Sequence, residues 1–175
     1  MPVGRPLKFV LLICFFDSSL ARADMTAQDA DSQIVKALME CPDAHSLLAI
    51  EGKCQALPLE ARVRVIRAAL AYLDSTKAVR LQVAEDIIIV PRIGVEANGG
   101  KGNGLMIWQD MDIEGGRAAW LIGSLLQQEM PVIKANLTEQ ERKDAIRQIS
   151  AFVKAYLQGI DDQRKSTSSG TNAGV

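Results

Sequence analysis

The chain has few histidines and cysteines, the side chains most used for zinc binding and for activating a nucleophile. Its 175 residues include a single histidine, His45, and three cysteines. It contains neither a C-x-x-C pair nor a G-x-S-x-G motif, so the usual arrangements for zinc binding and nucleophilic catalysis are missing. The sequence therefore predicts no metal and no cofactor, and it favours a non-enzymatic role.

The chain has little net charge, and it has few long apolar segments. Lys and Arg number 20 against 21 Asp and Glu, for a formal net charge of −1. A nucleic-acid-binding protein needs a basic face, so nucleic acid is not an expected partner. After residue 23 no stretch is apolar over the roughly 20 residues that a transmembrane helix requires, so none is predicted there. A length of 175 residues suits one domain with a single core.

The segment 1–23 has the features of a secretory signal peptide. Two basic residues precede a short apolar run over 9–16, and Ala21 and Ala23 place small residues where signal peptidase requires them. We expect cleavage after Ala23 and a periplasmic or secreted protein. The alternative is a buried N-terminal helix, which Asp17 and the following serines would interrupt.

Removal of that segment would leave two cysteines, Cys41 and Cys54, in an oxidising compartment. An even number of cysteines in an exported chain favours a structural disulfide. We expect this bridge to stabilise the fold by about 3 kcal/mol in the chain-entropy model. A pair of metal ligands is the alternative, and His45 alone gives it little support.

Apolar residues at helical spacing predict a mainly α protein, a small bundle of four to five helices. The expected helices cover 26–40, 44–51, 58–73, 117–130 and 138 to about 160. Gly52 is the expected stop of the second helix, and Thr138 and Glu141 form a capping box at the start of the last. The helix over 117–130 is the most apolar of these, so we expect it to be central and buried. Residues 24–160 would form the single domain, and the polar residues 161–175 a disordered tail.

The segment between the third helix and the central helix is ambiguous. Residues 75–90 fit a helix that ends before Pro91, but the β-branched run at its end fits a short buried strand equally well. The sequence NGGKGNG over 98–104 indicates a loop or hairpin tip. With 92–97 and 105–113 as flanking strands, we predict a glycine-rich β-hairpin, although helix remains an alternative for 87–113.

The same region carries the candidate partner-binding residues. Lys101 lies at the predicted loop tip, and Trp108 stands among acidic residues. An exposed tryptophan surrounded by carboxylates would anchor a protein contact, whereas burial in the core is the alternative for this residue.

The acidic residues Asp110, Asp112 and Glu114 complete the candidate set. Their alternation resembles the start of a calcium loop, yet Leu121 stands where that loop requires a bidentate Glu. We therefore favour an acidic patch at the N-terminus of the following helix over a calcium site.

Together these features favour an exported protein that binds another envelope protein. The most specific hypothesis is an inhibitor or immunity protein against an envelope-acting hydrolase, by analogy with other small exported helical proteins. One alternative is an accessory subunit or chaperone of an envelope secretion or conjugation assembly. A second is an unrecognised hydrolase that uses the carboxylates near Trp108.

Overall fold

The computed structural model describes residues 27–82, 87–89 and 105–169, and this part of the chain is mainly helical, as predicted. Its five helices are α1 (Ala27–Met39), α2 (Ala44–Gln55), α3 (Leu59–Leu70), α4 (Glu114–Leu126) and α5 (Glu139–Ser169). Two short strands, β1 (Ile87–Ile89) and β2 (Leu105–Ile107), complete the described elements. None of the helices in these ranges is both long and apolar enough to cross a bilayer.

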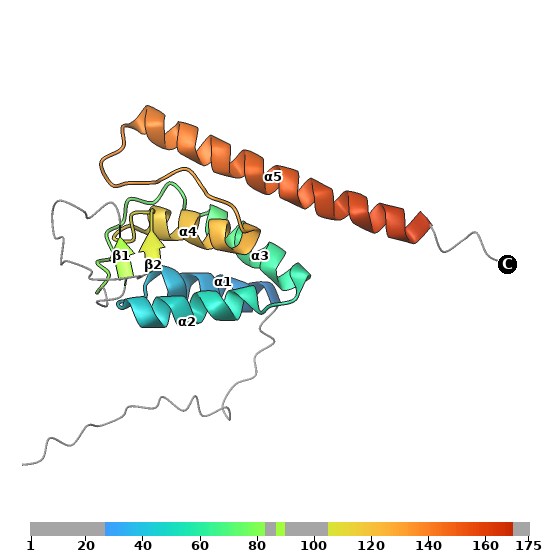
Figure 1. Ribbon diagram of the computed structural model, residues 1–175, viewed down its shortest axis with the longest axis horizontal. Helices are drawn as coiled ribbons and strands as arrows, with labels where there is room; N and C mark the ends of the chain where they lie inside the picture. Colours follow the sequence, from blue (N-terminus) through green and yellow to red (C-terminus); the bar gives the residue numbers. More distant parts are fainter. Residues whose placement is uncertain (1–26, 83–86, 90–104, 170–175) are drawn as a thin grey trace, which may run out of the picture.

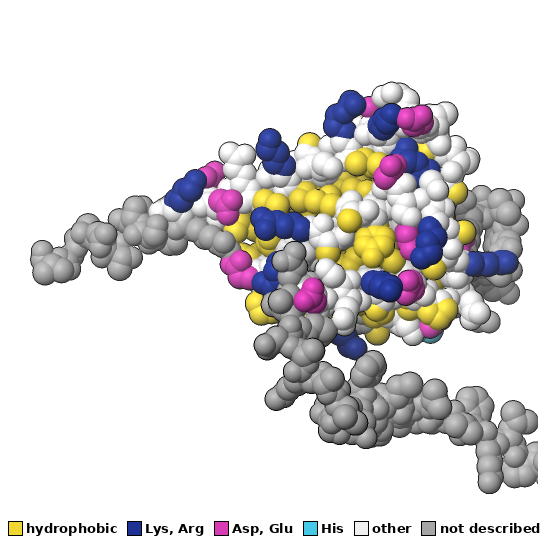
Figure 2. Space-filling model, turned by 180° about the vertical axis from the view of Figure 1, so that it is seen from behind, with side chains coloured by type: hydrophobic (Ala, Val, Ile, Leu, Met, Phe, Trp, Pro, Cys, Tyr) yellow, Lys and Arg dark blue, Asp and Glu magenta, His cyan; other side chains and the backbone are white. Residues whose placement is uncertain are grey.

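The helices form layers around α4. Figure 1 shows α1 and α2 along one side of the body, α3 and α4 next to them, and α5 crossing the opposite side. The central helix α4 contacts all four of the other described helices, and nearly all of its residues are buried. The prediction of a central buried helix is confirmed. Figure 2 shows the reverse face, where hydrophobic side chains gather in the middle of the body and charges of both signs lie among and around them.

The buried Arg117 of α4 joins several segments at the centre of the fold. Its side chain is fully buried, and the guanidinium donates to the carbonyl oxygens of five residues. These residues are Leu38, Met39, Cys41, Val79 and Met111, at donor–acceptor distances of 2.5–3.2 Å. Leu38 and Met39 lie in the last turn of α1 and Cys41 lies just after it. The last carbonyl oxygens of a helix lack partners within the helix and carry negative partial charge. Arg117 therefore satisfies the end of α1 from inside the core.

The described strands do not show the predicted hairpin. Strands β1 and β2 pair in parallel, with Ile87 opposite Leu105, whereas the strands of a hairpin are antiparallel. Strand β2 lies within the predicted second strand, but its partner is the β-branched run at 87–89. The predicted first strand at 92–97 and the loop at 98–104 lie outside the described residues.

The structure corrects the predicted helix over 75–90. Residues 75–82 are not helical, because their backbone groups pair with the segment that precedes α4. The amide of Val79 donates to the carbonyl oxygen of Asp112 at 2.8 Å, and the amide of Leu81 donates to the Asp112 carboxylate at 2.9 Å. The alternative interpretation, a short strand near the end of this segment, agrees with β1.

The predicted Cys41–Cys54 disulfide is wrong: both thiols are free and both residues are buried. Cys41 lies just before the N-terminus of α2, and Cys54 lies in the last turn of the same helix. At 1.5 Å per residue, the helix from Ala44 to Cys54 spans about 15 Å. A disulfide requires Cα atoms about 4.4 to 6.8 Å apart, so a straight helix keeps these two cysteines from meeting.

Two helices run further than predicted. Helix α2 continues through Gly52, the expected stop, to Gln55. Helix α5 begins with the predicted capping box, in which the Thr138 amide and hydroxyl donate to the Glu141 carboxylate at 2.8 and 2.7 Å. It then continues to Ser169, so residues 161–169 are helical and are not the predicted disordered tail. The predicted signal peptide lies outside the described residues and stays a prediction.

Candidate functional site

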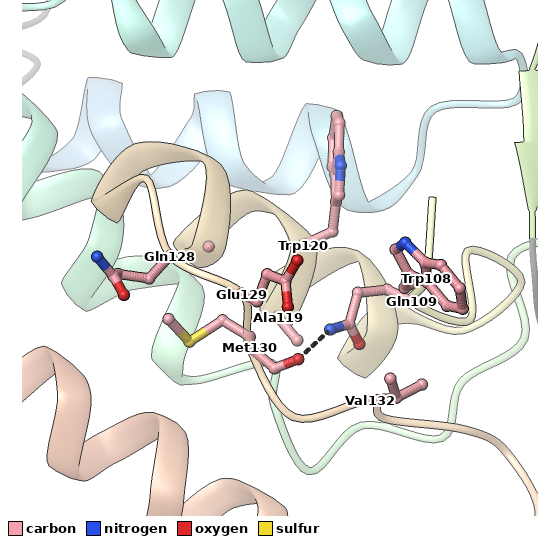
Figure 3. Close-up of a pocket in the computed structure, with 9 residues that line it drawn as sticks. Trp108, Gln109, Ala119, Trp120, Gln128, Glu129, Met130 and Val132 are labelled. Carbon is pink, nitrogen blue, oxygen red and sulfur yellow. Dashed lines mark hydrogen bonds between the residues drawn. The ribbon is translucent and has the colours of Figure 1, made fainter. Parts of the chain in front are cut away.

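Both tryptophans of the chain line one pocket of about 400 Å³ beside α4. Trp120 comes from α4, Trp108 from the segment just after β2, and Glu129, Met130 and Val132 from the segment that follows α4. Figure 3 shows these residues and the segments from which they come. We call it the Trp108–Trp120 pocket.

A tight reversal at the end of α4 brings the 128–132 segment to the pocket. Gln127 adopts a left-handed conformation with φ 54°, and the Gln128 amide turns back to donate to the Gly123 carbonyl oxygen at 3.0 Å. A Cβ at Gly123 would lie 2.8 Å from the Gln128 carbonyl oxygen, so only glycine permits this approach. The reversal directs the chain back along α4 and places Glu129 and Met130 at the pocket.

The opposite wall is held by Gln109, which is buried next to Trp108. Its side-chain amide donates to the carbonyl oxygens of Met130 and Pro131, both at 3.1 Å, and its Oε1 accepts from the Ile133 amide at 3.0 Å. The Gln109–Met130 bond is drawn in Figure 3. Because three bonds tie the two segments together, Trp108 and the 130–133 segment hold a defined relative position.

The exposed residues that line the pocket are Trp108, Gln128 and Glu129. Trp108 is 56% exposed, and Met106 on the neighbouring strand β2 is 49% exposed. The structure thus places Trp108 at the surface and not in the core, which was the alternative for this residue. An exposed tryptophan at a pocket is typical of a binding surface.

The carboxylates of Asp110 and Asp112 are engaged with the backbone. Asp110 accepts hydrogen bonds from the amides of Asp112 and Ala135, both at 3.1 Å. Asp112 accepts from the amide of Leu81 at 2.9 Å. Both side chains therefore hold loops in place, and their predicted role in partner binding is not tested by these contacts.

Glu114 is buried at the first turn of α4, where it accepts from Ser75 Oγ at 2.6 Å and from Lys77 Nζ at 2.8 Å. Burial by itself would raise the pKa of the Glu114 carboxyl, but the hydrogen bonds from Lys77 and Ser75 outweigh it and the pKa is lowered. The same contact raises the pKa of Lys77. Glu114 is therefore a buried carboxylate that joins α4 to the 75–77 turn.

Within the described ranges, no group of three or more acidic, histidine or cysteine side chains is placed to hold a metal ion. The beginning of a calcium loop at 110–114 thus does not fold into a cluster of carboxylates there. Lys101, the remaining predicted partner-binding residue, lies outside the described residues.

Sequence reasoning missed Trp120, Gln109 and Glu129. The available signal was the position of Trp120, which falls off the apolar stripe formed by Ala118, Leu121 and Ile122 on the same helix. A large aromatic residue on the face opposite such a stripe points away from the residues of the stripe, so it is a candidate for a site outside that part of the core. Nothing local in the sequence pairs Glu129 with either tryptophan.

Comparisons of the chain with protein families, with curated proteins and with solved structures give no significant match. The residues of the Trp108–Trp120 pocket are therefore the basis on which a function is inferred.

Proposed function

We propose that this protein is an exported, non-enzymatic binding protein that captures another envelope protein at the Trp108–Trp120 pocket. The single observation that carries the proposal is Trp108, a tryptophan more than half exposed that lines a pocket whose walls are joined by the hydrogen bonds of Gln109. Tryptophan is enriched among the residues that contribute most to protein–protein binding. A preformed wall lowers the cost of ordering on binding.

The hydrogen bonds of the polar side chains near the pocket support a binding role. Asp110, Asp112 and Gln109 each hold a backbone group in place, and the hydrogen bonds of Glu114 join α4 to the 75–77 turn. A hydrolase that used Asp110 or Asp112 would need these carboxylates for chemistry as well as for loop structure. That hypothesis therefore has the least support of the three.

The finer form of the proposal is an inhibitor or immunity protein that binds an envelope-acting hydrolase. Such a protein needs one tight and dedicated partner, which a compact surface with a tryptophan anchor would suit. The exported location on which it depends comes from the predicted signal peptide.

Affinity capture from an envelope extract, followed by mass spectrometry, tests the proposal. We expect the wild-type protein to retain one hydrolase in stoichiometric amount and to inhibit its activity, and Trp108→Ala to lose both effects. Phe152→Ala is the matched control, because Phe152 is a 47% exposed aromatic residue on α5, away from the pocket lining. Equal capture by Trp108→Ala and wild type would contradict the proposal.

One observation favours the accessory-subunit alternative. Helix α5 has 31 residues and is about 46 Å long, whereas the other helices have 12 or 13 residues. Figure 1 shows its C-terminal part extending past the body. If Phe152→Ala releases several envelope components while Trp108→Ala retains them, this second candidate replaces the first.

A further inference from the structure

The described lining of the Trp108–Trp120 pocket has one charge. Among the described residues that line it, Glu129 is the only acidic side chain, and none is Lys or Arg. Its carboxylate forms no ion pair or hydrogen bond within the described part of the chain. Among the described residues, the Glu129 carboxylate is thus the one charge that a ligand of the pocket meets, and none of these residues pairs with it.

The rest of the lining is suited to a flat cation with an apolar stem. Indole rings attract cations through their electron-rich faces, most strongly among the aromatic side chains. A guanidinium group is planar and only weakly hydrated, so it stacks on such faces better than a lysine ammonium. Met130 and Val132 offer an apolar wall for the methylene stem of an arginine.

A purely apolar ligand fits this lining less well. It would cover the Glu129 carboxylate without neutralising it, and burial of an unpaired charge opposes binding. The formal charge of the whole chain, −1, also does not repel a basic partner.

From this lining we infer that the pocket receives an arginine side chain of the partner protein, stacked against tryptophan and paired with Glu129. The inference rests on the proposed binding function and specifies its partner: a protein that presents an exposed arginine on a protruding segment. Trp108 and Trp120 would supply the aromatic contacts, and Glu129 would select the charge.

Intrinsic fluorescence tests the inference directly, because the only two tryptophans of the chain both line this pocket. The protein is titrated with N-acetyl-arginine amide and with N-acetyl-citrulline amide, which has the same length and planar end group but no charge. We expect a saturable change with the arginine probe and about tenfold weaker binding of the citrulline probe.

Variants assign the selectivity to the carboxylate. Glu129→Gln should weaken arginine-probe binding by roughly two- to fivefold, the range for an exposed ion pair, and leave citrulline binding unchanged. Glu139→Gln is the matched control, since Glu139 is an exposed acid on α5. Equal affinity for the two probes, no saturable change with either, or an unaltered Glu129→Gln variant would each overturn the inference.

The outcome is separable from that of the proposed function. If the arginine probe fails but Trp108→Ala still abolishes capture of the partner, the binding function stands and the arginine inference falls. If the arginine probe binds as expected but no envelope protein is captured, the pocket is a cation site and the proposed function falls.

Discussion

Replacement of Arg117 by methionine is expected to destabilise the protein by about 3 kcal/mol, because methionine keeps the apolar stem but removes every hydrogen-bond donor. The guanidinium donates to five main-chain carbonyl oxygens from α1, the 75–82 segment and the turn before α4. Its side chain is fully buried, so water does not reach these carbonyls without a rearrangement of the core.

The magnitude follows from opposing contributions. The Leu38 carbonyl oxygen also accepts from the Cys41 amide at 3.3 Å, so four of the five acceptors lose the donor that the structure describes. Each buried acceptor left without a donor costs about 1–3 kcal/mol, so the gross loss is about 4–12 kcal/mol. Folding of the variant no longer requires the removal of a guanidinium from water, and this offsets the loss by several kcal/mol. The net of about 3 kcal/mol is a large part of the 5–15 kcal/mol typical of a domain, and it corresponds to a Tm lower by roughly 6–12 °C.

Urea unfolding monitored by circular dichroism measures this difference, with Arg147→Met as the control. Arg147 lies on α5 with its side chain largely exposed and pairs with Asp144 on the same helix, so its replacement should leave the midpoint unchanged within error. A loss smaller than about 1 kcal/mol in Arg117→Met would refute the reasoning, since that is the cost of a single average hydrogen bond.

Three further predictions concern glycine packing, the thiols and pH. Gly116→Ala should destabilise the protein by about 2 kcal/mol or more, because the new Cβ would lie 1.9 Å from the Asp110 carbonyl oxygen. Gly52→Ala has open space around it and should stabilise α2 by about 0.5–1 kcal/mol. Urea midpoints of the two variants that shift in the same direction would contradict this prediction. Cys41 and Cys54 should react slowly with a thiol reagent at pH 8 until urea is added, because both are buried and burial raises the pKa of Cys54 to about 11. If neither cysteine reacts in the denatured protein, the two form a disulfide and the prediction is wrong. Glu114→Gln should be less stable than wild type above pH 4.5, the unperturbed pKa of the carboxyl group. The difference in stability should disappear as the pH falls through the lowered pKa of the folded state. A difference in Tm that does not vary with pH would show that ionisation of Glu114 is not its cause.

Periodicity along the chain was sufficient to locate most helices. The apolar spacing and the capping box at Thr138 predicted the start of α5, because both signals involve residues within one or two turns. The end of α4 was misplaced, since Gln127 turns the chain in a left-handed conformation four residues before Pro131. A glutamine in this conformation has no local signature, because glycine and asparagine are the usual residues there.

Errors arose where a residue's partner lies far along the chain. The segment 75–82 looked helical from its spacing, but its amides bond to Asp112, about thirty residues away. The disulfide prediction counted cysteines and ignored the length of the helix between them. For Arg117, the sequence shows a charged residue at the start of an apolar helix and nothing of the carbonyl oxygens that surround it.

The sequence by itself determined the helical class, the approximate position of the helices, and the choice of Trp108 as a candidate contact residue. These depend on local propensity, spacing and side-chain type. Only the tertiary structure decided that Trp108 shares a pocket with Trp120 and Glu129, and that Asp110 and Asp112 hold loops. The physical reason is that a pocket is made by segments brought together in the fold, and contacts between distant segments leave no periodic trace in any one of them.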